Sequence, residues 1–139
     1  MKHIIPFSLF ALLTLGACNN SSDDDSNNPS IPNSDLSGNW KVTYFWDEDE
    51  DETYEFNGYT FEFKSDGTFV ALLPGGSTQN GTWGERPDDG VTKLDITIPG
   101  AKPLDELNED WVILEKTNTS LKLRDDDNTY LEEIHFIKQ

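Results

Sequence analysis

Carboxylates are the most abundant reactive side chains in this chain, which carries 27 Asp and Glu against 10 Lys and Arg. Two runs concentrate them: residues 47–52 alternate Asp with Glu, and residues 125–127 are all Asp. Carboxylate oxygens suit calcium, yet neither run has the glycine position and ligand series of an EF-hand loop. We therefore predict no metal site and keep three residues as weak calcium candidates, Asp47, Asp49 and Asp51.

A catalytic site would need partners for these acids, and the sequence offers few. His135 is the only histidine after His3, so a zinc site lacks ligands. A Ser-His-Asp triad lacks the Gly-x-Ser-x-Gly turn that exposes a nucleophile. His135 alternates with Leu131, Glu133 and Ile137, which is typical of a partly exposed strand position. Paired carboxylates would suit a glycosidase. An enzyme with acidic catalytic residues is therefore our third hypothesis. It ranks behind two binding functions, given below, that need neither catalysis nor a cofactor.

Aromatic side chains offer a binding chemistry that needs no cofactor. The chain holds 4 Trp, 8 Phe and 4 Tyr, and in so short a domain most of them must fill the core. Those near one end of a barrel would stack on sugar rings or contact apolar molecules. Four residues are therefore candidates for ligand binding: Trp46, Tyr59, Trp83 and Trp111.

Short alternating stretches must position these side chains. Apolar and polar residues alternate over short runs, and turn-forming residues such as Asp66-Gly67 separate the runs about every ten residues. Strands are predicted near 40–46, 59–64, 68–73, 81–85, 93–98, 110–116, 120–124 and 130–137, with a helical turn near 103–107. In the first strand four residues share one face: Trp40, Val42, Tyr44 and Trp46. Eight strands joined in order favour an all-β fold, a closed antiparallel up-and-down β-barrel, which exposes no edge strand.

The start of the first strand resembles a known family. Residues 36–41, Leu-Ser-Gly-Asn-Trp-Lys, resemble the Gly-x-Trp opening of lipocalins, and residues 61–69, 81–83 and 114–124 resemble short bacterial lipocalin-like domains. The resemblance implies a lipocalin-like, calycin-type barrel that holds a small apolar molecule, entered from one open end. It also implies that a late arginine packs over the opening tryptophan, and the matching residues are Gly38, Trp40 and Arg124. Strand parity sets Arg124 opposite Leu121 and Leu123, so both orientations of Arg124 stay open.

The N-terminus predicts export and anchoring. A basic start at Lys2 and the apolar run that follows are typical of a secretory signal peptide over residues 1–17, too short to span a membrane. Leu15-Gly16-Ala17-Cys18 resembles the lipobox of bacterial lipoproteins, in which cleavage leaves the cysteine first. The resemblance implies that Cys18 carries acyl chains such as palmitate, which attach the protein to the membrane. Cys18 has no disulfide partner, because it is the only cysteine.

Residues 18–35 predict a disordered acidic stalk, because residues 19–34 contain a single apolar side chain. A set of four residues that follows Cys18 resembles the export signal of some surface lipoproteins of Gram-negative bacteria. These residues are Ser22, Asp23, Asp24 and Asp25. The resemblance implies an outer-membrane protein that faces outward. The alternative is that these residues are simply part of a polar stalk.

The net charge of −17 argues against a nucleic-acid partner, since the protein's field repels phosphates. The sequence thus predicts a surface-exposed outer-membrane lipoprotein, with a lipocalin-like domain at 36–139 that binds a small apolar molecule or glycan at one barrel end. The alternative is a packed barrel that serves as a protein-interaction module of the envelope. A cavity of a few hundred Å³ inside the barrel would favour ligand binding, and a filled barrel would favour the interaction module.

Overall fold

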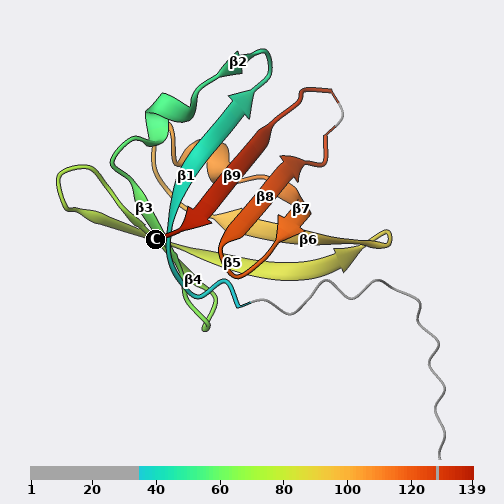
Figure 1. Cartoon of the computed structure of the whole chain (residues 1–139), viewed down its shortest axis with the longest axis horizontal. Coiled ribbons are helices and arrows are strands. Elements are labelled where there is room, and N and C mark those ends of the chain that lie inside the picture. Colours follow the sequence, from blue (N-terminus) through green and yellow to red (C-terminus); the bar gives the residue numbers. More distant parts are fainter. Residues whose placement is uncertain (1–34, 128) are drawn as a thin grey trace, which may run out of the picture.

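The structure, a computed structural model, describes residues 35–127 and 129–139 (Figure 1). The predicted signal peptide, the predicted lipidation residue Cys18 and the predicted export signal lie outside the described residues. In the described part the strands are β1 (Gly38–Asp47), β2 (Glu50–Asp51), β3 (Thr60–Phe63), β4 (Thr68–Leu72), β5 (Thr78–Asp88), β6 (Val91–Thr97), β7 (Asp110–Lys116), β8 (Ser120–Asp125) and β9 (Glu133–Lys138). Two single-turn 3-10 helices accompany them, η1 (Thr53–Phe56) and η2 (Asp105–Leu107). None of the helices described is long and apolar enough to cross a membrane.

The strands form a closed antiparallel barrel. Neighbours in the sheet follow the order β2-β1-β3-β4-β5-β6-β7-β8-β9, and β9 pairs back with β1. In Figure 1 the first and last strands of the ring, β1 and β9, lie side by side. The two-residue β2 stands outside the ring, because it forms only a hairpin extension of β1. The predicted eight-stranded antiparallel up-and-down barrel is therefore confirmed, and it is consistent with a lipocalin-like barrel.

Aromatic side chains fill the barrel. Phe61 stacks on Phe69 with ring centroids 5.5 Å apart, and Phe63 lies 4.9 Å from Phe69 and 6.0 Å from Phe136. Leu36 and Trp40 belong to the same buried cluster as Phe56, Leu104 and Leu107, which come from η1 and from the β6–β7 loop (residues 98–109). The interior is thus packed with side chains in mutual contact.

The predicted face of β1 is wrong beyond Val42. The pairing of β1 with β9 shifts register between Val42 and Tyr44, as in a β-bulge, and an extra residue in one strand reverses the alternation of its side chains. Phe45 consequently points inward and is fully buried, whereas Tyr44 and Trp46 are half-buried on the outer face. Trp46 is therefore not on the face shared by Trp40 and Val42.

A cation packs over the opening tryptophan, Trp40, but it is a lysine and not the arginine that the lipocalin resemblance implies. Trp40 is fully buried, and its indole N–H donates a 2.7 Å hydrogen bond to the carbonyl oxygen of Leu36. Lys138 on β9 places its ammonium nitrogen 5.4 Å from the centre of the Trp40 ring. Arg124 is exposed on β8, on the face opposite the buried Leu121 and Leu123. Lys138, not Arg124, makes the cation–π contact.

All eight predicted strands exist, but β9 begins at Glu133 instead of residue 130, and β5 is longer than expected. It runs from Thr78 to Asp88 and pairs with β4 in its first half and with β6 in its second. Gly81 permits this change of partner, because a Cβ atom there would lie 2.1 Å from the carbonyl oxygen of Thr97. The helical turn expected near 103–107 is η2. Two elements were not predicted: β2, which lies within the acidic run at 47–52, and η1, which follows it.

Candidate functional site

The barrel wall is interrupted between β1 and β3. These strands pair only from Gly38 to Trp40, and β1 next meets a strand on this side at Trp46, where β2 begins. Residues 41–44 of β1 therefore face a gap. A hollow of about 320 Å³ opens there, and we call it the β1–β3 groove. Its lining comes from β1, the η1–β3 connection and the chain end: Lys41, Val42, Thr43, Phe56, Asn57, Gly58, Tyr59, Thr60 and Gln139.

The η1 segment produces this break. Thr53 Oγ1 accepts a 2.8 Å hydrogen bond from the Phe45 amide, and the Glu52 amide donates to the Phe45 carbonyl at 2.9 Å. These bonds occupy the β1 main chain beyond the gap. Phe56 then enters the core, with its ring 5.1 Å from that of Phe45. The chain thus leaves the wall at β2 and returns only at β3.

Of the four aromatic residues that the sequence offers as candidates for ligand binding, only Tyr59 lines the β1–β3 groove. Its half-buried ring stacks parallel to Phe61 at 6.0 Å and meets Phe56 edge-on at 6.3 Å. Gly58, before it, has φ +83, where a side chain would be strained and would lie 3.2 Å from Pro74. The ring is therefore fixed by the core on one side while it lines the groove.

The groove combines an apolar floor with an uncharged polar rim. Val42, Phe56 and Tyr59 supply apolar surface. The rim carries hydroxyl and amide groups, and Thr60 Oγ1 lies 3.5 Å from the Gln139 side-chain oxygen. Lys41 is the one charged side chain of the lining, which contains no Asp or Glu side chain although the chain has 27 of them. This lining is suited to holding a polar, uncharged molecule.

An ion cluster around the exposed Lys102, the Lys102 cluster, links the η1 segment to the β6–β7 loop. The Lys102 ammonium lies 2.7 Å from Glu52, 3.6 Å from Glu106, 3.8 Å from Glu55 and 3.9 Å from Asp47. The close contact with Glu52, together with the charges of Glu106 and Glu55, raises the pKa of Lys102 above its ordinary range. One ammonium therefore links carboxylates from β1, η1 and the β6–β7 loop at the end of the barrel next to the groove wall.

Glu132 lies beside this cluster as an acid without a counter-ion. Burial, followed by the negative charges of Asp47, Glu109, Asp125 and Glu106, raises the pKa of Glu132 to about 7. Its Oε2 is buried without a hydrogen-bond partner. Burial also raises the pKa values of Glu106 and Glu109. We call the end of the barrel that η1 and the β6–β7 loop cover the capped end. At neutral pH the carboxylates there repel one another.

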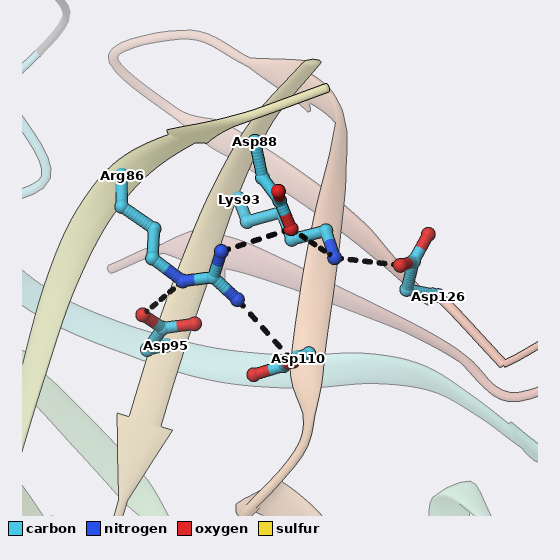
Figure 2. A network of polar contacts seen from close by, with 6 residues as sticks. All are labelled: Arg86, Asp88, Lys93, Asp95, Asp110 and Asp126. Atoms are coloured by element: carbon cyan, nitrogen blue, oxygen red, sulfur yellow. Dashed lines mark hydrogen bonds and ion pairs between the residues drawn. The ribbon is translucent and has the colours of Figure 1, made fainter. Parts of the chain in front are cut away.

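A second polar network, shown in Figure 2, fastens the β5–β6 hairpin to β7 and to the β8–β9 loop. The Arg86 guanidinium contacts Asp95 at 2.8 Å, Asp88 at 2.9 Å and Asp110 at 3.2 Å. Lys93, with only 6% of its side chain exposed, lies 2.7 Å from Asp88 and 2.6 Å from Asp126. Hydrogen bonds from Lys93 and Arg86 lower the pKa of Asp88. Because both cations are fully paired, we assign this network a structural role.

An acidic hollow of about 410 Å³ lies beside the Figure 2 network. Its lining shares Asp110 and Asp126 with that network and adds four neighbours, Asn108, Glu109, Asp125 and Asp127. Asp127 accepts a 2.8 Å hydrogen bond from the Thr129 amide, as expected for a turn. Acidic residues in a solvated turn do not by themselves define a binding site.

The weak calcium candidates do not converge in the structure. Asp47 lies near Lys102, and Asp51 accepts a 2.9 Å hydrogen bond from the Thr53 amide. Asp49 is exposed in the turn between β1 and β2. Within residues 35–127 and 129–139, no group of three or more His, Cys, Asp or Glu side chains is arranged to hold a metal ion.

The other aromatic candidates lie apart from Tyr59 and from one another. Trp111 is fully buried and donates to the Leu107 carbonyl at 3.1 Å. Trp83 packs against Phe63, and Trp46 is on the outer face of β1. Sequence reasoning missed the residues that face Tyr59 across the gap. Residues 41–43 and 57–60 line the same hollow because β1 and β3 stop pairing at Trp40, and local sequence does not show where that pairing stops.

His135 lies on the outer face, as its strand parity predicted. A quarter of its side chain is exposed, and Nε2 is 2.6 Å from Glu133. Its ring lies 4.7 Å from that of Tyr44 across the β1–β9 ladder. His135 is thus engaged by strand neighbours and lies outside the groove lining.

Comparison of the chain with protein-family models, with curated proteins and with solved structures finds no match.

Proposed function

We propose that this chain is a lipoprotein of the outer membrane, exposed at the cell surface, whose lipocalin-like barrel binds a small molecule without catalysis. The anchor rests on the lipobox resemblance at Cys18, and the outward orientation rests on the acidic segment that follows it. The binding site is the β1–β3 groove. A single observation carries this assignment: the barrel wall breaks where Tyr59 is half-buried beside a hollow of about 320 Å³.

Native mass spectrometry tests the binding function. The mature lipoprotein is exposed to extract from its own cells, purified and ionised, and we expect a bound small molecule. Tyr59→Ala should lose this molecule because the groove loses its aromatic wall. Tyr54→Ala is the matched control, since Tyr54 is 63% exposed on η1 and does not line the groove. Ligand-free spectra for the wild type would contradict the proposal.

The anchor and its orientation need separate tests. Labelled palmitate should enter the wild-type chain and not the Cys18→Ala variant. Replacing Asp23, Asp24 and Asp25 with Ala should abolish antibody labelling of intact cells while the protein stays in the membrane fraction. Undiminished surface labelling would refute the export signal and leave the anchor standing.

The filled interior favours a second candidate function, an envelope protein-interaction module. Phe61, Phe63, Phe69 and Phe136 occupy the space in which a larger lipocalin would hold its ligand. In this case the outer surface would meet a partner protein, and substitutions at Tyr59 would leave the activity intact. Cross-linking in intact cells distinguishes the two, because only the interaction module requires a reproducible protein adduct.

A further inference from the structure

The size and depth of the β1–β3 groove restrict its ligand. Ligand pockets in proteins are usually about 300 to 1,000 Å³, and this groove, at about 320 Å³, is near the lower limit. Its floor ends at Phe56 and Tyr59, which pack on Phe61 in the filled core. An acyl chain therefore finds no channel into the barrel. The groove accommodates a compact molecule of one or two rings.

The rim of the groove selects hydrogen-bonding ligands. Thr43, Asn57, Thr60 and Gln139 present hydroxyl and amide groups, which both donate and accept hydrogen bonds. A purely apolar ligand would strip water from these groups without replacing their hydrogen bonds. A polyhydroxylated ligand replaces them.

Charge excludes ionic ligands from the same place. A cationic ligand, although attracted by the net charge of the chain, would meet the ammonium of Lys41 in the groove and no Asp or Glu side chain to pair with. An anion would find only Lys41, within a chain whose net charge of −17 repels it. An uncharged molecule avoids both penalties.

We propose that the ligand of the β1–β3 groove is an uncharged saccharide of one or two rings, which packs the C–H face of one ring on Tyr59 and bonds the polar rim through its hydroxyl groups. This inference rests on the proposed binding function and names its ligand class. It assigns Tyr59 as the stacking residue and Asn57 and Thr60 as hydrogen-bonding residues.

Saturation-transfer NMR on the purified mature lipoprotein tests this inference, in a detergent without a sugar head group. The probes are glucose, galactose, N-acetylglucosamine, maltose, cellobiose and lactose, with glucuronate as the anionic probe and laurate as the apolar probe. We expect at least one neutral sugar to bind and glucuronate and laurate not to bind. Tyr59→Ala should weaken the bound sugar about tenfold, and Tyr59→Trp should retain it.

Two further variants keep the test decisive if Tyr59→Ala disturbs folding. Asn57→Ala removes an exposed rim amide and should weaken sugar binding several-fold, whereas the control Tyr54→Ala should leave it unchanged. Laurate or glucuronate binding that depends on Tyr59, without sugar binding, would overturn the saccharide inference and leave the binding function intact. Absence of binding by every probe would overturn the saccharide inference, and the extract experiment above then decides separately whether the groove binds anything.

Discussion

Replacing Glu132 with Gln should stabilise this protein at neutral and alkaline pH. Glu132 is partly buried at the capped end of the barrel, where four acids from β1, η2, the β6–β7 loop and β8 face it: Asp47, Glu106, Glu109 and Asp125. Its Oε2 has no hydrogen-bond partner. The folded state therefore favours the protonated carboxyl, and ionisation of Glu132 opposes folding.

The size and sign of the effect follow from the pKa. The pKa of Glu132 is about 7 in the folded protein, against an ordinary value of 4.5. That difference corresponds to roughly 3 kcal/mol at about 1.4 kcal/mol per tenfold change in the proton equilibrium. Because the carboxyl is partly exposed, screening by water reduces the expected effect to about 1 to 2 kcal/mol. Stability from this group is complete below pH 4.5 and is lost as the pH rises toward 7.

Urea unfolding at pH 4 and pH 8 measures this difference. Glu132→Gln should match the wild type at pH 4 and exceed its free energy of unfolding at pH 8 by about 1 to 2 kcal/mol, with a melting temperature roughly 5 to 10 °C higher. Asp89→Asn is the control, since it removes one charge from the exposed tip of the β5–β6 hairpin and should change little. An equal effect of Glu132→Gln at both pH values, or destabilisation at pH 8, would refute the reasoning.

Three other substitutions probe the cap, the core and the wall. Lys102→Met should lower the free energy of unfolding by about 1 to 2 kcal/mol, because it leaves Glu52 unpaired. The same variant should speed hydrogen exchange of the amides at 52–59. Lys102→Arg should retain most of the stability. Phe61→Ala should lower the free energy of unfolding in urea by about 3 to 5 kcal/mol, and a loss below 1 kcal/mol would contradict a packed interior. Gly81→Ala should lower the melting temperature strongly through its clash with Thr97, while Gly84→Ala, with open space around it, should not; equal effects would argue against the close approach of β5 and β6.

The strands were largely predictable because local alternation governs them. Leu94, Ile96 and Ile98 alternate without interruption, and all three are buried. The bulge in β1 was not predictable from the same pattern, since an aromatic residue stands at each of the positions 44, 45 and 46. Only pairing with β9 decides which of them points inward, and Phe45 is the one buried.

The candidate site was predictable only in part. Tyr59 was identified because it alternates with Phe61 and follows the acidic run, both of which are local properties. Its neighbours across the groove depend on where β1 stops pairing with β3, which is a contact between distant segments. The same holds for Lys102, which meets Asp47 and Glu52 about fifty residues earlier in the chain. The acidic run offered only weak calcium candidates, and the local sequence could not show that Lys102 is the cation that contacts Asp47 and Glu52.

The central claim is that a small molecule binds where β1 and β3 separate. Two-dimensional amide NMR of the isotopically labelled protein, titrated with the neutral sugar panel, locates binding directly. We predict shifts at residues 41–43 and 57–60, on both sides of the gap, and unchanged signals for the acidic hollow at 108–110 and 125–127. Shifts confined to the acidic hollow or to the outer face around His135, or no shifts with any sugar, would contradict the account.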